Sequence, residues 1–156
     1  MKNIVLAAGY ATRMYPLTEN FPKPLLAVGT STILDKMLED VDSLDDIDEH
    51  IIVTNHRFIH IFEEWLTGAI QRYAKPIRLL DDGSTSNDNR VGAVGDLIAA
   101  IREFGVNDDI LVAAADNLLD FSLGLLPFPT SRAVFLFLCG SVYGHNTYCR
   151  FYQPLL

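Results

Sequence analysis

The chain has little cysteine. Among its 156 residues only Cys139 and Cys149 occur, and both lie near the carboxyl end. Two cysteines in this position do not form the disulfide framework of a small secreted domain, so we expect a reduced, cytoplasmic protein. Their spacing with His145 matches no zinc-binding pattern and a fourth ligand is lacking, so we expect no zinc site there.

Long apolar runs are also absent. No segment approaches the roughly 18 apolar residues that a membrane-spanning helix requires. The apolar patch that follows Lys2 is interrupted by Gly9 and Arg13, which makes it too short for the core of a signal peptide. We therefore expect no membrane partner.

Basic charge is scarce. The chain has 12 Lys and Arg residues against 20 Asp and Glu residues, which gives a net charge of -8. Such a surface disfavours binding to nucleic acid, because phosphate backbones are held by clusters of positive charge. Any anion that this protein binds must therefore be held by a local positive site. The 49% hydrophobic content predicts one folded domain over residues 1–156.

Strand and helix patterns alternate along the first three quarters of the chain. Helical spacing of apolar residues follows Thr32, which with Asp35 resembles a capping box, and recurs over residues 57–69 and 91–104. This alternation predicts an α/β fold, a Rossmann-like three-layer sandwich with a mainly parallel sheet. The four predicted buried strands are Asn3–Ala8, His50–Asn55, Pro76–Asp82 and Asp108–Asn117.

The segment LAAGYATRMYPLTENFPKPLL, residues 6–26, follows directly from the first strand. Gly9 allows a tight turn in which backbone N–H groups approach an anion. Arg13 supplies a planar fork of donors and Lys23 a compact charge, and three prolines stiffen the loop between and around them. This arrangement suits a triphosphate. The alternative is an ordinary loop with solvated cations, and the segment lacks the Gly-Lys-Ser/Thr ending of a P-loop.

The same segment resembles the signature of the sugar-phosphate nucleotidylyltransferases, Leu-Ala-Ala-Gly-x-Gly-Thr-Arg-x-x-Pro-Leu-Thr followed by Pro-Lys-Pro-Leu. Ala11 departs from it, because the second glycine usually stands there. The matching residues are Gly9, Thr12, Arg13, Pro16, Leu17, Thr18, Pro22, Lys23, Pro24 and Leu25. The resemblance implies the nucleotide-diphospho-sugar transferase type of fold, and it covers residues 1–120.

The resemblance also implies roles for individual residues. The backbone of Ala8, Gly9, Tyr10, Ala11 and Thr12 would cradle phosphate. Arg13 would contact the β- and γ-phosphates, and Lys23 would neutralise charge that grows at the α-phosphate. Asp116, at the end of the fourth strand, stands where the family keeps an aspartate that binds Mg²⁺. The alternative for Asp116 is a helix cap.

A glycine-opened helix begins within NRVGAVGDL, residues 89–97. In the family, Gly92 and Gly95 would let the nucleotide base lie against the backbone, and the alternative is close packing of the helix on the sheet. Asp81 and Asp96 are either polar contacts or solvated carboxylates, and we favour the second interpretation. Asn55 and His56, at the end of the second strand, either line the same cleft or simply end the strand.

The resemblance implies transfer of a nucleoside monophosphate from a nucleoside triphosphate to a sugar 1-phosphate or a similar phosphorylated acceptor, with release of pyrophosphate. Residues 121–156 contain one plausible strand, 133–139, but no Asp or Glu for a second metal. We therefore expect a truncated form, or a second chain that completes the site by association through this apolar tail. Two alternatives are an inactive nucleotide-binding domain and a cytidylyltransferase that acts on phosphocholine.

Overall fold

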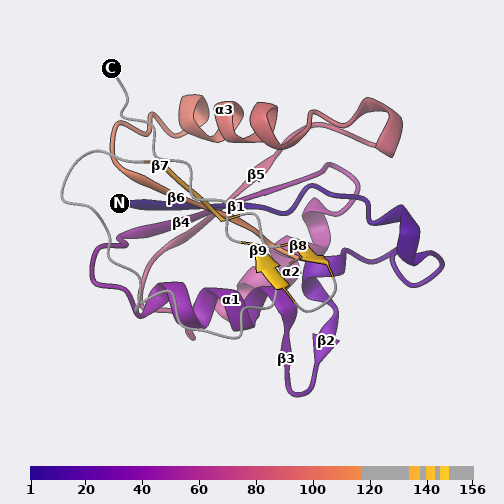
Figure 1. The fold of residues 1–156 in the computed structure, drawn as a ribbon, viewed down its shortest axis with the longest axis horizontal. Coiled ribbons are helices and arrows are strands. Elements are labelled where there is room, and N and C mark those ends of the chain that lie inside the picture. Colours follow the sequence, from indigo (N-terminus) through magenta and orange to yellow (C-terminus); the bar gives the residue numbers. More distant parts are fainter. Residues whose placement is uncertain (117–133, 138–139, 143–144, 148–156) are drawn as a thin grey trace.

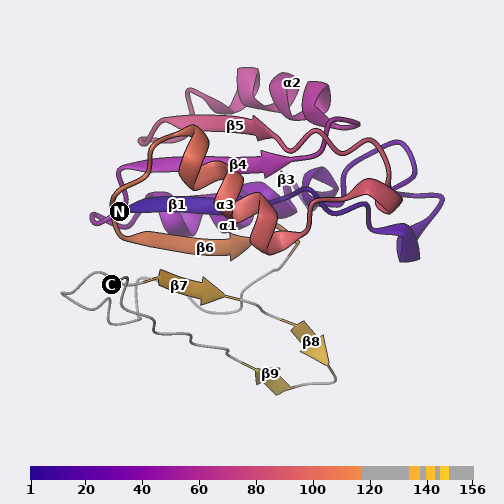
Figure 2. The ribbon, with the colours of Figure 1, turned by 90° about the horizontal axis from the view of Figure 1, so that it is seen from above.

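The sheet has five parallel strands, and its first strand lies at the centre. The computed structural model describes residues 1–116, 134–137, 140–142 and 145–147. The strand order is β5-β4-β1-β6-β7, as Figure 2 shows from above. The strands are β1 (Lys2–Leu6), β4 (Glu49–Thr54), β5 (Ile77–Asp81), β6 (Ile110–Ala114) and β7 (Val134–Phe137).

Helices cover both faces of this sheet (Figure 1). The helices α1 (Ile33–Asp42) and α2 (Ile59–Ala69) pack on one face, where Leu34, Leu38 and Phe62 are buried with Val5. Helix α3 (Ala93–Glu103) covers the other face, where Ala100 is buried among residues of β1, β4 and β6. The predicted Rossmann-like sandwich is confirmed. Its strands read as continuous apolar runs because both faces are covered.

Short elements complete the described chain. The 3₁₀ helices are η1 (Thr12–Met14), η2 (Lys23–Leu25) and η3 (Asn87–Asn89), and the small hairpins are β2 (Ala27–Val28) with β3 (Ser31–Thr32) and β8 (Gly140–Val142) with β9 (His145–Thr147). Among the described helices, none combines the length and the apolar character that crossing a bilayer requires. The two cysteines lie outside the described residues, and so do most of the residues to which we assigned association.

The predicted elements are confirmed, but their ends differ. The strand predicted over Asn3–Ala8 ends at Leu6, because Ala7 and Ala8 already belong to the connection that follows β1. The capping box at the start of α1 is present, with Asp35 N donating to Thr32 Oγ1 at 3.0 Å. Helix α3 begins at Ala93, after Gly92 with φ of 87°. The strand predicted over 133–139 is β7 and adds a fifth parallel strand beside β6.

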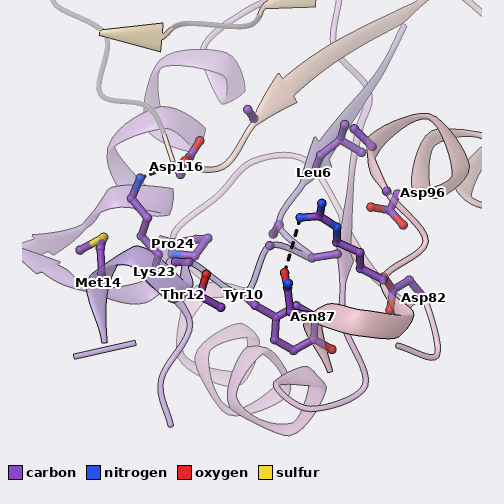
Figure 3. A pocket seen from close by; sticks show the side chains of 18 of the residues that line it. Leu6, Tyr10, Thr12, Met14, Lys23, Pro24, Asp82, Asn87, Asp96 and Asp116 are labelled. Atoms are coloured by element: carbon purple, nitrogen blue, oxygen red, sulfur yellow. Dashed lines mark hydrogen bonds and ion pairs between the residues drawn. The ribbon is translucent and has the colours of Figure 1, made fainter. Parts of the chain in front are cut away.

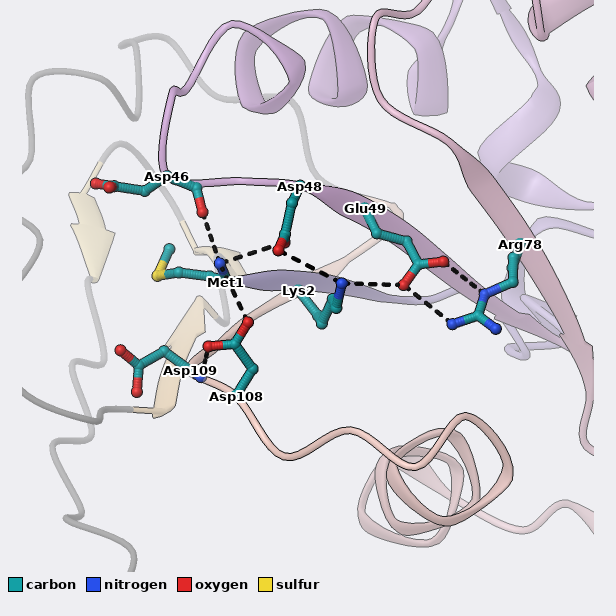
Figure 4. A network of polar contacts seen from close by, with 8 residues as sticks. All are labelled: Met1, Lys2, Asp46, Asp48, Glu49, Arg78, Asp108 and Asp109. Atoms are coloured by element: carbon teal, nitrogen blue, oxygen red, sulfur yellow. Dashed lines mark hydrogen bonds and ion pairs between the residues drawn. The ribbon is translucent and has the colours of Figure 1, made fainter.

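A network of charges joins the amino ends of the strands (Figure 4). The Met1 ammonium donates to the Asp46 carbonyl oxygen at 2.7 Å and pairs with Asp48 at 3.3 Å and with Asp108 at 3.5 Å. Glu49 accepts from Arg78 Nε at 2.6 Å. Because the strands are parallel, this acidic edge is opposite to the edge where their carboxyl ends meet. The carboxyl edge is therefore the place for a ligand.

Candidate nucleotide site

A cleft of about 840 Å³ opens at the carboxyl ends of β1 and β6. These two neighbours mark the point at which the strand order reverses, since β4 and β5 lie on one side of β1 and β6 and β7 on the other. Ligands of open parallel sheets bind at such a point. Among the predicted residues, Ala8, Gly9, Tyr10, Ala11, Thr12, Arg13, Lys23, Gly92 and Asp116 all line the cleft.

The loop after β1 forms one wall of the cleft. Ala11 has φ of 47° and ψ of 40°, the left-handed conformation that normally favours glycine. Its carbonyl oxygen accepts from Thr18 Oγ1 at 2.8 Å and from Met14 N at 2.9 Å, which holds the turn in place. Thr12 and Arg13 follow in η1 and are exposed. The backbone conformation at position 11 therefore explains why the family signature has glycine there. Alanine at this position is strained.

Gly9 and Tyr10 contribute to this wall in different ways. A Cβ atom at Gly9 would meet no atom within 4 Å, so glycine there leaves the cleft open rather than relieving a clash within the chain. The Tyr10 side chain is buried, and its hydroxyl donates to Ser84 Oγ at 3.2 Å. Burial raises the pKa of this phenol. The ring packs near Phe58, so Tyr10 anchors the loop in the core.

Asn55 fixes the start of the loop from below. It is fully buried, its Nδ2 donates to the Ala8 carbonyl oxygen at 3.0 Å, and its Oδ1 accepts from Phe58 N at 3.0 Å. Neither Asn55 nor His56 lines the cleft. His56 Nδ1 lies 2.6 Å from Asp81 Oδ2, and the Asp81 side chain is 32% exposed, so Asp81 makes a polar contact and is also partly solvated. Asn55 is a support for the loop.

Lys23 and Asp116 meet on one side of the cleft (Figure 3). Lys23 is the first residue of η2, and Pro24 follows it directly. Asp116 lies just after the end of β6. Lys23 Nζ lies 2.9 Å from Asp116 Oδ2, and the side chains are 26% and 52% exposed, respectively. The pair is open to solvent and contributes little to stability. It brings the cation from the loop segment and the strand-end carboxylate to one place.

Asp96 and Asp82 lie on the other side of the cleft (Figure 3). Asp96 is only 4% exposed, so its interpretation as a solvated carboxylate was wrong. Burial, the nearby charge of Asp82 and a proton that the two carboxyl groups can share raise the pKa of Asp96 to about 6. Asp82 Oδ1 accepts from Ser84 N and from Ser84 Oγ, both at 2.7 Å. A buried acid pair thus forms part of the cleft.

A family model described as Nucleotidyl transferase matches residues 2–127. The chain belongs to the nucleotidyl transferase family. One curated relative, the UTP–glucose-1-phosphate uridylyltransferase of Synechocystis sp., is 28% identical over 128 residues, which cover 79% of this chain and 32% of the relative.

Two solved structures share the fold. A Bacillus anthracis protein assigned as a glucose-1-phosphate thymidylyltransferase aligns with a TM-score of 0.63 and 24% identity, over 79% of this chain and 47% of its own. The CTP:phosphocholine cytidylyltransferase of Streptococcus pneumoniae aligns with a TM-score of 0.56 and 26% identity, over 78% of this chain and 47% of its own. This nucleotidyl transferase chain therefore spans less than half the length of these relatives.

Gly92, just before α3, and Gly95, within it, have different surroundings in this nucleotidyl transferase. Gly92 lines the cleft, and its φ of 87° suits glycine at the turn into the helix. Gly95 is not among the lining residues, and a Cβ atom there would lie 2.5 Å from Val91 Cγ1. A side chain at position 95 would therefore meet Val91 in the turn before α3 rather than the sheet, and the predicted contact of Gly95 with the base stays a prediction.

Sequence reasoning missed Asn87, Arg90 and the acid pair. Arg90 Nη1 donates weakly to Asn87 Oδ1 at 3.5 Å, and both residues line the cleft. The available signal was the position of DDGSTSNDNR between the end of a strand and a glycine-opened helix, where a loop must cross the binding edge. Nothing in its composition showed which of its polar residues face the ligand.

Asp116 is suited to bind a magnesium ion whose coordination shell is completed by phosphate oxygens. Within the described residues no three His, Cys, Asp or Glu side chains gather as a metal site. Magnesium commonly binds through one or two carboxylates together with substrate phosphates, so a single exposed carboxylate beside a phosphate loop suffices. Asp116 has that position, and its neighbour Lys23 would supply a second positive charge for the same phosphates.

Proposed function

We propose that this chain is the nucleotide-binding part of an enzyme that transfers a nucleoside monophosphate from a nucleoside triphosphate to a sugar 1-phosphate. The observation that carries the proposal is the convergence of Arg13, Lys23 and Asp116 with the loop after β1 around one cleft. A cytoplasmic location, and any partner beyond these two substrates, stay predictions from the sequence.

The triphosphate lies along the loop after β1. Backbone N–H groups of residues 8–12 bind phosphate oxygens, and the absence of a side chain at Gly9 lets the phosphates approach the chain. Arg13 binds the β- and γ-phosphates through its fork of donors. These contacts hold the α-phosphorus in position, and they neutralise charge on the leaving pyrophosphate.

In the reaction, an oxygen of the acceptor phosphate attacks the α-phosphorus, and the bond to the bridging oxygen of the β-phosphate breaks. Lys23 places its ammonium beside the α-phosphate, where negative charge grows in the transition state. A magnesium ion held by Asp116 and the phosphates would supply further positive charge there. The chain forms no covalent intermediate, so its contribution is positioning and electrostatic stabilisation.

Calorimetric titration with ATP, CTP, GTP and UTP in the presence of Mg²⁺ tests this function. We expect magnesium-dependent binding, weakened about tenfold or more in Arg13→Ala, because a charge-assisted contact is lost. Arg102→Ala is the matched control, since Arg102 is exposed near the end of α3 and does not line the cleft. Absence of binding to a folded sample, or equal effects of the two substitutions, contradicts the proposal.

The acceptor is tested separately by release of pyrophosphate. Glucose 1-phosphate and phosphocholine are the two acceptors to compare, because the similar proteins above are named for both. Formation of product with the sugar phosphate supports the transferase, and product with phosphocholine alone favours the cytidylyltransferase alternative. Nucleotide binding without any product favours the predicted inactive domain.

A further inference from the structure

Two carboxyl oxygens in the cleft receive no hydrogen bond. Asp96 Oδ1 and Asp82 Oδ2 are buried, and no group of the described part of the chain donates to either. Both residues line the cleft, and Asp96 is 4% exposed. Two carboxylates offer acceptors alone, so a shared proton, a cation or a donor that enters the cleft must satisfy them, and among these a neutral donor on a ligand is the one that the proposed nucleotide supplies.

The donor cannot belong to a phosphate group, because an anion is repelled by this acid pair. Lys23 and Asp116, which hold the phosphate end, lie across the cleft from Asp82 and Asp96 (Figure 3). A nucleotide whose phosphates follow Arg13 and Lys23 therefore extends its nucleoside towards the acid pair. The apolar side chains of Leu6 and Ala7 in the lining suit the face of a base.

Among the bases, guanine matches two neighbouring acceptors best. Its N1–H and 2-amino group are adjacent donors on one edge, whereas uracil and thymine present one N–H between two carbonyl oxygens. Adenine and cytosine each place an acceptor nitrogen next to their amino group. Asn87 and Arg90 provide donors in the same cleft for O6 and N7 of guanine, the atoms that arginine commonly binds.

We infer that Asp96, together with Asp82, accepts hydrogen bonds from the N1–H and 2-amino group of guanine and makes this chain selective for GTP. The inference rests on the proposed function, since it assigns the base of the same nucleotide. Uracil and thymine nucleotides are rejected because their carbonyl oxygens would face the carboxylates. The cleft volume of about 840 Å³ falls within the usual range for small-molecule sites.

The test is titration of the unmodified chain with GTP, ITP, dGTP and UTP in the presence of Mg²⁺. ITP lacks only the 2-amino group, and dGTP lacks only the ribose 2′-hydroxyl. We expect GTP and dGTP to bind with similar affinity, ITP about tenfold or more weakly, and UTP more weakly still. If dGTP rather than ITP loses affinity, the acid pair binds ribose and the inference is overturned.

Asp96→Asn is the decisive variant, because it keeps the shape of the side chain and replaces one acceptor by a donor. We expect the preference for GTP over UTP to fall to less than about threefold. Asp88→Asn is the matched control, since Asp88 is exposed in the same loop outside the cleft lining, and it keeps the preference.

The failures of the two proposals are distinguishable. Equal binding of GTP and UTP by the unmodified chain, or an unchanged preference in Asp96→Asn, overturns the inference and leaves the transferase proposal intact. If no nucleotide binds to the folded chain, both proposals fall.

Discussion

Lys23 Nζ and Asp116 Oδ2 lie 2.9 Å apart, although 93 residues separate them in the chain. The pair connects the loop segment that follows the first strand to the end of β6, across the point where the strand order reverses. Since neither side chain is buried, the contact is not explained by the stability of the fold. Its position in the cleft agrees with the proposed roles of Lys23 in binding phosphate and of Asp116 in binding metal.

Asp116→Asn separates these two roles. We expect the substitution to change the free energy of unfolding by less than about 1 kcal/mol, because the pair is solvent-exposed. Nucleotide binding should lose its dependence on Mg²⁺, since the neutral amide is a poor ligand for a hard cation. Calorimetry with and without Mg²⁺ checks this, and Asp45→Asn, an exposed position after α1, is the control. Unchanged dependence on Mg²⁺ would remove Asp116 from the metal site.

Ala11→Gly is expected to stabilise the protein. The left-handed φ of 47° at Ala11 costs an alanine more than a glycine, so we expect the free energy of unfolding to rise by about 0.5–1 kcal/mol. Ala99→Gly makes the same chemical change within α3, where glycine is unfavourable, and should lower it by about 1 kcal/mol. Urea unfolding of the two variants gives the comparison. A loss of stability in both would show that Ala11 is not strained.

The Asp96 carboxyl makes stability depend on pH in a defined direction. Its pKa is raised from 3.8 to about 6, so between these values the folded chain holds a proton that the unfolded chain has lost. Stability therefore falls as pH rises from about 4 to 6, by roughly 2–3 kcal/mol for this one group.

Asp96→Asn removes this titrating carboxyl and therefore this part of the pH dependence. The free energy of unfolding of the variant, relative to that of the unmodified protein, should rise as pH rises from about 4 to 6. Urea unfolding at several pH values measures the difference between the two proteins, and Asp88→Asn corrects for the general effect of one negative charge. Parallel pH profiles for Asp96→Asn and the unmodified protein would show that the carboxyl titrates normally.

Asp35 ties α1 to α2 and to the segment after α2 by hydrogen bonds, so we expect its substitution to lower the free energy of unfolding strongly. Its Oδ1 accepts from Tyr73 Oη at 2.8 Å and from Trp65 Nε1 and Arg72 Nη2, both at 3.0 Å. Burial acts to raise the pKa of this carboxyl, but these hydrogen bonds and those from Thr32 outweigh it and lower the pKa.

Asp35→Asn should therefore cost about 2–4 kcal/mol, because an amide leaves some of these donors without an acceptor. Urea unfolding measures the loss, which should shrink as pH falls below about 4, because the unfolded chain then takes up a proton that the folded carboxylate, with its lowered pKa, still lacks. Asp45→Asn is again the exposed control. A cost below about 1 kcal/mol would contradict the structural role.

The sequence predicted what depends on local pattern. Buried strands and a capping box are properties of neighbouring residues, so β1 and β4 were recognised within two residues of their ends, and the start of α1 was recognised from its cap. The segment from Gly9 to Lys23 was identified because its glycine, cations and prolines occur together. Its strain at Ala11 was not predicted, because a backbone angle follows from the turn that Thr18 and Met14 close.

The acid pair shows where such reasoning ends. Asp82 and Asp96 are separated by a loop and the first turn of α3, and only the packing of that helix on the sheet buries Asp96. A carboxylate near the start of a helix normally faces solvent, which is why Asp96 was misassigned. For Gly95, contact with the base and packing of the helix were both open from the sequence, and the contact with Val91 in the preceding turn was not foreseen.

The central place of β1 has a consequence for the order in which the protein forms. Of the strands in the sheet, β1 comes first in the chain, but its two neighbours, β4 and β6, begin at Glu49 and Ile110. One edge of β1 can pair as soon as β4 has been made, but its other edge stays unpaired until β6 follows, and pairings between such distant segments form slowly. Because Asp116 follows β6, the pairing that completes the sheet around β1 also brings Asp116 beside Lys23 in the cleft.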